Sequence, residues 1–241
     1  MKKDFDRQAS QKVIRFTLVE LLLVAVFAVV LATLLLPGVR AAQIQTRQSA
    51  CMSNLQACGR ANALYANDHD GHFVQYRAWT SDFWTGVLYS DHYLPRKEAI
   101  YCPDLAPAQF AWSVGYGALK QQANLWPGIS TADPCWTFRA SAVKKPAAVP
   151  YLGDSAEPAG NGLQQIVFVE PFGAQRTWHL RHAGCANIWY MDGHTAAEDR
   201  QLGKIFADFL ENNAVSGARD SECRVWLDSG KFSDNLRAGN R

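Results

Sequence analysis

The sequence has little net charge and no closely paired cysteines. With 24 Lys and Arg against 22 Asp and Glu, the formal net charge is +2. Binding to nucleic acid normally needs a concentrated basic face, so we expect no nucleic-acid partner. The six cysteines stand singly along the chain, and the lack of a CxxC pair removes the strongest sequence sign of zinc or thioredoxin-like chemistry.

Motifs of the common enzyme classes are also missing. The sequence has no nucleophile elbow, P-loop or dinucleotide fingerprint. We therefore expect neither catalysis nor a bound cofactor or metal. Apolar residues are abundant instead, since hydrophobic residues make up 48% of the 241 residues and charged residues 19%. This balance predicts one ordered domain of ordinary size with an appendage.

The N-terminal region holds a long apolar run, which extends from Leu21 to Leu36 and ends at Pro37. Together with residues 16–19 it approaches the roughly 20 residues that cross a bilayer as a helix. Residues 1–15 are basic, and the apolar run contains no Lys or Arg. This asymmetry predicts a single membrane span with the leader in the cytoplasm and the rest of the chain outside.

Glu20 is a carboxylate close to the start of this apolar stretch. An ordinary signal peptide also begins basic and then turns apolar, but its apolar region is shorter and has no such charge. Burial of a carboxylate in lipid costs a few kcal/mol unless it finds a partner. We therefore treat Glu20 as a functional candidate. The simpler alternative is a side chain that reaches the headgroups near the helix start.

After Pro37 the sequence is more polar but still favours a helix, which we expect to reach about Ala66. One stripe of helical spacing holds Cys51, Leu55, Cys58 and Tyr65, and Asn62 interrupts it. The turn signal Asp70-Gly71 ends the helix. Because Cys51 and Cys58 lie two helical turns apart, about 10 Å along the axis, they cannot form a disulfide with each other.

The remaining residues, 67–241, predict a head of loops, short strands and one further helix. The expected strands are Ile166–Val169 and Ala186–Met191, and the expected helix is Leu202–Leu210. The fold class is therefore α+β. A long N-terminal helix, residues 16–66 with the membrane span at 16–37, packs on a head with a small antiparallel sheet.

The segment Phe16-Thr17-Leu18-Val19-Glu20-Leu21-Leu22 resembles the processing motif of type IV prepilins and type II secretion pseudopilins. The resemblance implies that a prepilin peptidase and methyltransferase removes residues 1–15, cuts between Arg15 and Phe16, and methylates the new amine of Phe16. The family usually has Gly before the cut, where this sequence has Arg15. By the same resemblance, Glu20 is an assembly residue and Pro37 marks a bend in the helix.

Signals in the head resemble one subgroup of these proteins. They are Cys51 with Asn54-Leu55, the segment Tyr65–Gly71, Cys102-Pro103, and His182 followed after nine residues by Asp192-Gly193. The last spacing matches the prepilin-type processing-associated H-X9-DG signature. An extracytoplasmic compartment favours disulfides, and the resemblance makes Cys51–Cys102 the bridge that we expect between the stem helix and the head.

The resemblance implies a structural subunit of a type IV pilus or of a type II secretion-like filament, held in the inner membrane beside other pilin-like subunits. A second interpretation belongs to another class of function. In that case the chain is a membrane-anchored binding module whose head captures a ligand and never polymerises. A third, an envelope hydrolase that uses the histidines of the head, lacks any nucleophile motif.

His182, Asp192 and Gly193 have two interpretations. With His179 and His194 nearby in the sequence, they supply imidazoles and a carboxylate that suit a transition metal. Alternatively, Asp192-Gly193 forms the tight turn that ends the strand, and His182 is a hydrogen-bonded structural residue at its other end. We expect the structural role, because the spacing fits no known ligand template.

The stretch Asn67–His72 is loosely similar to a calcium loop, because acidic residues alternate there and a glycine follows them. It lacks the bidentate Glu that an EF-hand needs at a fixed offset. We expect a turn that ends the helix, with calcium in the head as the weaker alternative.

Overall fold

The computed structural model describes residues 17–77, 82–107, 109–119, 135–143, 145–159, 162–165, 167–169, 177–199 and 226–227. The chain divides into two compact units, Met1–Gln45 and Thr46–Arg241, and each is described by itself. The leader, the Arg15–Phe16 cleavage position and the helix expected at Leu202–Leu210 lie outside the described residues.

One long α-helix, α1, begins at Leu18 and ends at Asp68. Its 51 residues correspond to about 75 Å at a rise of 1.5 Å per residue. The prediction of a single long N-terminal helix is therefore confirmed over the described residues. Pro37 lies inside the helix, and the helix continues past it. The bend expected at Pro37 stays a prediction.

The predicted turn at Asp70-Gly71 ends α1. The Gly71 N–H donates a 2.7 Å hydrogen bond to the Ala66 carbonyl. Gly71 has φ +80° and Asp70 has φ 52°. Glycine adopts this left-handed conformation without a steric penalty, which explains its place just after the helix.

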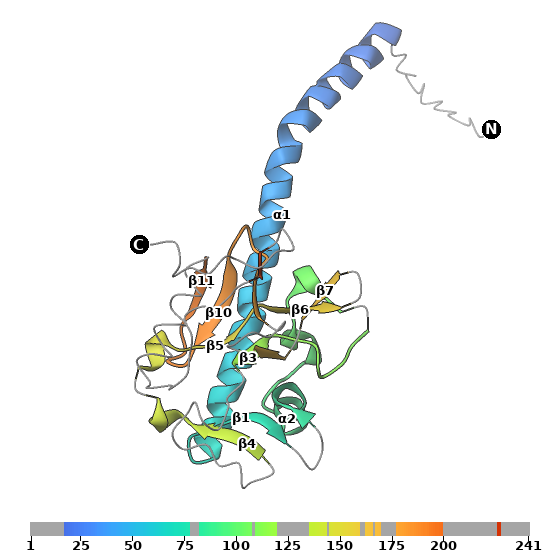
Figure 1. Cartoon of the computed structure of the whole chain (residues 1–241). Coiled ribbons are helices and arrows are strands. Elements are labelled where there is room, and N and C mark those ends of the chain that lie inside the picture. The colour runs from blue at the N-terminus through green and yellow to red at the C-terminus, as the bar shows by residue number, and fades with distance from the viewer. Residues whose placement is uncertain are drawn as a thin grey trace, which may run out of the picture. The chain divides into compact units, whose positions relative to one another are not determined.

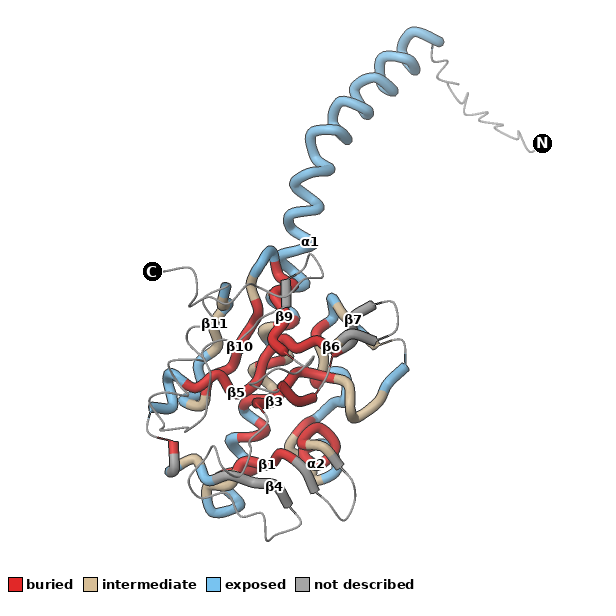
Figure 2. Tube along the Cα trace, viewed as in Figure 1, coloured by how far each residue is buried: buried red, intermediate tan, exposed pale blue. Residues whose placement is uncertain are grey.

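The part of α1 in the first unit is apolar and exposed. Leu18 is 78% exposed and Leu34 is 71% exposed, and Figure 2 shows this part of the helix in the exposed colour throughout. By length and composition, α1 is able to cross a membrane, although a signal sequence meets the same criterion. Water does not favour an apolar surface of this extent, so it needs lipid or protein around it.

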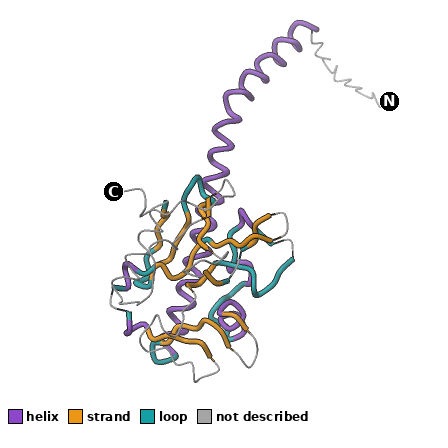
Figure 3. Tube along the Cα trace, viewed as in Figure 1, coloured by secondary structure: helices purple, strands orange, loops and turns teal. Residues whose placement is uncertain are grey.

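The head contains three sheets in the described residues, with the strand orders β2-β1-β4, β11-β10-β5-β3-β8 and β12-β9-β6-β7 (Figures 1 and 3). The first comprises β1 (His72–Arg77), β2 (Asp82–Phe83) and β4 (Cys135–Arg139). The second comprises β3 (Gly117–Leu119), β5 (Pro150–Gly153), β8 (Phe168–Val169), β10 (Ala186–Tyr190) and β11 (Thr195–Glu198). The third comprises β6 (Ser155–Ala159), β7 (Gly162–Gln164), β9 (Thr177–Leu180) and β12 (Trp226–Leu227).

In the described residues of the head, the helices that follow α1 are short. They are α2 (Trp84–Ser90) and the 3₁₀ turns η1 (Lys97–Ile100), η2 (Pro103–Leu105), η3 (Ala140–Ala142) and η4 (Pro146–Ala148). The α+β class is confirmed. The predicted strand Ala186–Met191 corresponds to β10, and the predicted strand Ile166–Val169 corresponds to the shorter β8.

The expectation of an antiparallel sheet is wrong in two places. Strand β3 pairs in parallel with β8, and β9 pairs in parallel with β12. Parallel neighbours need a crossover connection rather than a hairpin. Both pairs join segments that are distant in the sequence, so no local turn signal predicts them.

The last turns of α1 supply one side of the main core. The buried stripe contains the predicted Cys51, Leu55, Cys58 and Tyr65, and also Gly59, Ala61, Asn62 and Ala66. Asn62 is fully buried, and its amide group donates to the Cys58 carbonyl at 3.4 Å. The residue that seemed to interrupt the stripe therefore belongs to it.

Gly59 lies where the Trp189 side chain of β10 packs on α1. A Cβ atom added at Gly59 would lie 2.4 Å from atoms of the Trp189 indole, whereas one added at Gly38 would meet nothing within 4 Å. The absence of a side chain at Gly59 thus lets the buried Trp189 ring lie directly on the helix backbone.

We expect Gly59→Ala to destabilise the head, although Ala normally favours a helix over Gly by up to about 1 kcal/mol. The added methyl group forces the indole away, and overpacking of this kind costs roughly 1–3 kcal/mol. Thermal unfolding monitored by near-UV circular dichroism measures the effect. Gly38→Ala in the same helix is the matched control and should not lower the midpoint. Equal midpoints for Gly59→Ala and the wild type would contradict the packing.

Candidate functional site

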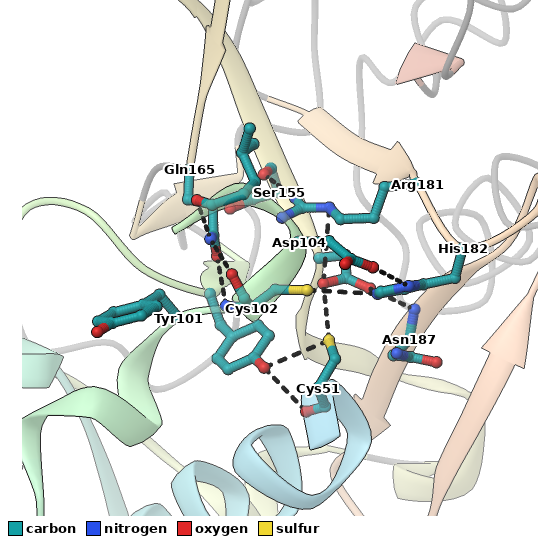
Figure 4. A network of polar contacts seen from close by, with 12 residues as sticks. Cys51, Tyr101, Cys102, Asp104, Ser155, Gln165, Arg181, His182 and Asn187 are labelled. Carbon is teal, nitrogen blue, oxygen red and sulfur yellow. Dashed lines mark hydrogen bonds and ion pairs between the residues drawn. The ribbon is translucent and has the colours of Figure 1, made fainter. Parts of the chain in front are cut away.

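Four side chains with metal-ligand chemistry converge inside the head. They are Cys51, Cys102, Asp154 and His182, all buried, and their ligand atoms lie within 4.8 Å of one another. Figure 4 labels Cys51, Cys102 and His182, whose sulfurs and imidazole point toward one another. Four separate segments of the chain supply them, and we refer to the four residues as the CCDH cluster.

Cys51 enters the CCDH cluster from α1, two turns before Cys58. Its Sγ donates to Asp154 Oδ1 at 3.3 Å. The buried Tyr116 hydroxyl donates to the Cys51 carbonyl at 2.8 Å and contacts the Cys51 sulfur at 3.3 Å. This part of the helix is thereby held to the segment that leads into β3.

Cys102 lies between η1 and η2, and its backbone is held by the side chain of Gln165. The Cys102 N–H donates to Gln165 Oε1 at 2.9 Å, and Gln165 Nε2 donates to the Cys102 carbonyl at 2.9 Å. Gln165 also donates to the Leu105 carbonyl at 2.6 Å. A buried amide must satisfy its donors and its acceptor, and here it does so by fixing the Cys-Pro segment.

Asp154 is the single residue between β5 and β6, and it therefore joins the five-stranded sheet to the four-stranded one. Its backbone N–H donates to the Asn187 carbonyl at 3.0 Å, and its carbonyl accepts from the His179 N–H at 2.8 Å. The Asn187 N–H donates to Asp154 Oδ2 at 2.8 Å. The carboxylate is fully buried, and the Arg181 guanidinium lies 3.8 Å from it.

His182 begins a two-residue turn between β9 and β10. It exchanges backbone hydrogen bonds with Cys185 at 2.9 and 3.1 Å. Ala183 and Gly184 between them have φ 54° and +85°. Two successive positive φ values define the tight hairpin turn whose twist matches that of the flanking strands. This turn fixes the position from which the imidazole extends into the CCDH cluster.

Both ring nitrogens of His182 have acidic or sulfur neighbours. Nε2 lies 3.2 Å from Asp154 Oδ2 and 3.4 Å from Cys102 Sγ. Nδ1 lies 3.1 Å from Asp104 Oδ2, and Asp104 in turn lies 3.6 Å from Arg47. The ring is therefore oriented from both sides.

The charges in the cluster favour an ion pair between Cys102 and His182. A hydrogen bond from Cys51 and one from His182 lower the pKa of Cys102 to about 6. Burial by itself would lower the pKa of His182, but hydrogen bonds to Asp154 and Cys102 outweigh it and raise this pKa to about 10. At neutral pH the pair is a thiolate beside an imidazolium.

The pKa values of the other two members of the cluster shift in opposite directions. Burial, assisted by the neighbouring Asp154, raises the pKa of Cys51 far above its ordinary value. Burial alone would also raise the pKa of Asp154, but the Arg181 charge and the His182 contact outweigh it and lower this pKa. Asp154 is thus a carboxylate, and Cys51 is a neutral thiol that donates to it.

A thiolate–imidazolium pair is the arrangement that cysteine nucleophiles use in catalysis. Here Cys102 is 0% exposed and His182 is 2% exposed. A substrate carbonyl cannot reach the Cys102 sulfur while the head is folded. The geometry suits chemistry that needs no substrate access, namely a disulfide between the two sulfurs or an enclosed ion.

The structure brings Cys51 and Cys102 together, both as free thiols. The predicted Cys51–Cys102 disulfide stays a prediction. Cys58, also free, lies apart from Cys51 and donates to the Ala99 carbonyl at 3.2 Å. Cys223 and the side chain of Cys135 lie outside the described part of the chain.

His182 and Asp192 do not meet, because they lie at opposite ends of β10. Asp192-Gly193 forms the predicted turn into β11, with Gly193 at φ +98° and Asp192 Oδ1 accepting from the His194 N–H at 3.1 Å. The His194 ring contacts the same carboxylate at 2.5 Å and stacks on Tyr190. The alternative metal set of His179, His182, Asp192 and His194 is therefore not assembled.

Sequence reasoning missed several residues of the site: Asp104, Tyr116, Asp154, Gln165 and Asn187. The Gly153-Asp154 pair is a turn signal in the sequence, which describes its backbone but not its carboxylate. The best indication of this role in the sequence is that Asp154, an acidic residue, directly follows an apolar segment. The remaining residues carry no local signal, because only tertiary contacts give them a role.

No protein-family model, curated protein or solved structure matches this chain significantly. The resemblance to prepilins therefore rests on the motifs described above.

We expect the head to lose stability in mild acid because of His179. This side chain is 5% exposed, and burial together with the Arg181 charge lowers its pKa to about 4 from an ordinary 6.5. Between these values the unfolded chain binds a proton that the folded chain does not, so the free energy of unfolding falls as the pH drops.

Urea unfolding at several pH values from 6.5 to 4 tests this fall in the free energy of unfolding. The midpoint of the wild type should fall more steeply over this range than that of His179→Gln, which has no titrating ring. His194→Gln removes a half-exposed imidazole elsewhere in the head and controls for the loss of a histidine as such. Equal slopes for the wild type and His179→Gln would contradict the assignment.

Proposed function

We propose that this protein is a prepilin-like structural subunit, held in the inner membrane by residues 16–37 and assembled with other pilin-like subunits into a pilus or secretion filament. The main observation behind the proposal is that α1 consists of two parts with different surroundings. One α-helix, Leu18–Asp68, contains both an exposed apolar segment and a segment buried in the core of the head.

The exposed segment supports membrane insertion. Each large aliphatic side chain transferred from water to an apolar environment contributes about 1.5–3 kcal/mol. Leu22, Val26 and Val30 are between about half and two thirds exposed, and their neighbours are similar. Lipid around the isolated subunit satisfies this surface, and the same surface on other copies would satisfy it in a filament.

The buried segment supports a mechanical role for the helix. Leu55, Cys58 and Tyr65 belong to the main core, together with side chains from the sheets of the head. The head therefore cannot separate from this segment without losing its core. A subunit built in this way transmits force between its anchor and its head, as a filament component must.

Glu20 supports the proposal through its contacts with Thr17. Glu20 Oε2 accepts from the Thr17 N–H at 2.8 Å and from the Thr17 hydroxyl at 2.9 Å. The Glu20 N–H donates to Thr17 Oγ1 at 3.2 Å. This reciprocal arrangement is a capping box, which satisfies donors that the first turn of a helix leaves unpaired.

A cut before Phe16 would place a charged amine one residue before this box. We infer two roles for Glu20, a cap for the helix and a counter-charge for the amine of its own or a neighbouring subunit. A buried charge pair of this kind specifies axial register between stacked helices, as buried polar residues do in coiled coils.

We expect the mature chain to begin with N-methylated Phe16. Mass spectrometry of the N-terminus, on protein from native membranes, checks this directly. Arg15→Gly restores the residue that the family usually has before the cut and should be processed at least as completely. An uncut N-terminus would contradict the proposal, and so would a cut beyond Pro37, which indicates an ordinary signal sequence.

We expect assembly, but not membrane insertion, to depend on the charge of Glu20. Glu20→Gln retains the capping box, since Gln serves in its place, but removes the charge. Thr17→Ala retains the charge of Glu20 but removes the hydroxyl group that takes part in the capping box. Insertion follows apolar length and should be normal in both variants.

Cross-linking between subunits in the membrane and recovery of filaments measure assembly. Glu20→Gln should fail to assemble, and Thr17→Ala should retain most of the assembly of the wild type. The opposite result would leave Glu20 as a helix cap alone. If the wild type itself is processed, inserted and never found in a multimer, the protein is a membrane-anchored binding module instead.

A further inference from the structure

We propose that Cys51, Cys102, Asp154 and His182 bind one Zn²⁺ ion in a closed, four-coordinate structural site. The ligand atoms are the two cysteine sulfurs, one oxygen of Asp154 and Nε2 of His182. This inference is independent of the proposed function, because it rests on the interior of the head alone.

Three of the separations within the cluster lie close to the edges of a zinc tetrahedron. Bonds of about 2.3 Å to sulfur and about 2.0 Å to nitrogen or oxygen imply edges of roughly 3.3–3.8 Å. The Cys51 sulfur lies 3.3 Å from Asp154 Oδ1, and the Cys102 sulfur lies 3.4 Å from His182 Nε2. His182 Nε2 lies 3.2 Å from Asp154 Oδ2. Because the four ligand atoms all lie within 4.8 Å of one another, an ion would draw the longer separations in by up to about 1 Å.

The groups around the cluster match the outer shell of a zinc site. A histidine that binds metal almost always presents its other ring nitrogen to a carboxylate, a carbonyl or water. His182 Nδ1 lies 3.1 Å from Asp104 Oδ2, on the side away from the cluster. The Tyr116 hydroxyl contacts the Cys51 sulfur at 3.3 Å, and the Asn187 N–H holds Asp154 Oδ2 at 2.8 Å.

The buried charges balance when the ion is present. Two thiolates and a carboxylate exceed the charge of Zn²⁺ by one negative unit. The Arg181 guanidinium, which lies 3.8 Å from Asp154 and whose side chain is 3% exposed, supplies one positive unit. Buried charges are tolerated when they are paired in this way. Because no ligand is exposed, the site has no open position for substrate and is structural rather than catalytic.

A disulfide between Cys51 and Cys102 competes for the same two sulfurs. A disulfide uses the two thiols and leaves Asp154 and His182 as a charge pair at the junction of the two sheets. The structure turns the imidazole toward the sulfurs (Figure 4), and the Asp154 carboxylate lies within 4.8 Å of them. Convergence of four ligand types from four segments favours the ion.

The test uses the full chain in detergent, purified with a thiol reductant and without chelators. Metal content is measured by mass spectrometry after dialysis. We expect one zinc per chain in the wild type, and zinc at background level in Cys51→Ser and Cys102→Ser. Cys58→Ser is the matched control, since Cys58 is equally buried in the same helix but donates to Ala99. It should retain one zinc per chain.

A second measurement on the wild type covers the case in which the cysteine variants do not fold. Replacement of zinc by Co²⁺ should give the strong visible bands of a tetrahedral cobalt–thiolate site. Those bands should disappear when one equivalent of Zn²⁺ is added, because zinc displaces Co²⁺ from the same site.

Three results would overturn the site. The first is a Cys51–Cys102 disulfide in metal-free protein taken directly from the native compartment. The second is zinc retained equally by all three serine variants. The third is a wild type that binds neither zinc nor Co²⁺ when reduced.

Discussion

The buried carboxylate of Asp154 is the constraint on which the arrangement of the head depends. It occupies the single position between β5 and β6, and its backbone and side chain bind segments from both sheets. A buried carboxylate is stable only when its charge is compensated. Arg181 and His182 supply that compensation, and both lie in the short segment that returns the chain from β9 to β10. The chain therefore crosses between the two sheets twice at the same place, held by one set of charges.

This arrangement gives the spacing between His182 and Asp192-Gly193 a physical meaning. The histidine and the Asp-Gly pair are the two ends of β10, and each end performs a separate task. Asp192-Gly193 makes the turn into β11, whereas His182 enters the junction between the sheets. The fixed spacing is then the length of one strand and its flanking residues, rather than the spacing of two groups that act on a common substrate.

The sequence predicted the elements whose signals are local. The stripe from Cys51 to Tyr65, the Asp70-Gly71 turn and the strand at β10 follow from periodicity and turn chemistry, and the structure contains them. The parallel pairings of β3 with β8 and of β9 with β12 were not predicted, since they depend on contacts between distant segments. The sequence did not predict that Cys51, Cys102 and His182 share one site, since the first two were expected as a disulfide and the third as a structural residue. Cys51, Cys102 and His182 were singled out, but Asp154 was missed because its carboxylate matters only once two sheets meet around it.

The close approach of Trp189 to Gly59 determines when the head can fold during synthesis. The helix that contains Gly59 emerges early, whereas β10, which covers it, emerges after most of the chain has been made. Until then the part of the stripe around Gly59 lacks the indole that covers it. Contacts that span so much sequence form slowly, because a long loop must close first. The stem helix therefore completes its packing only after β10 has been made.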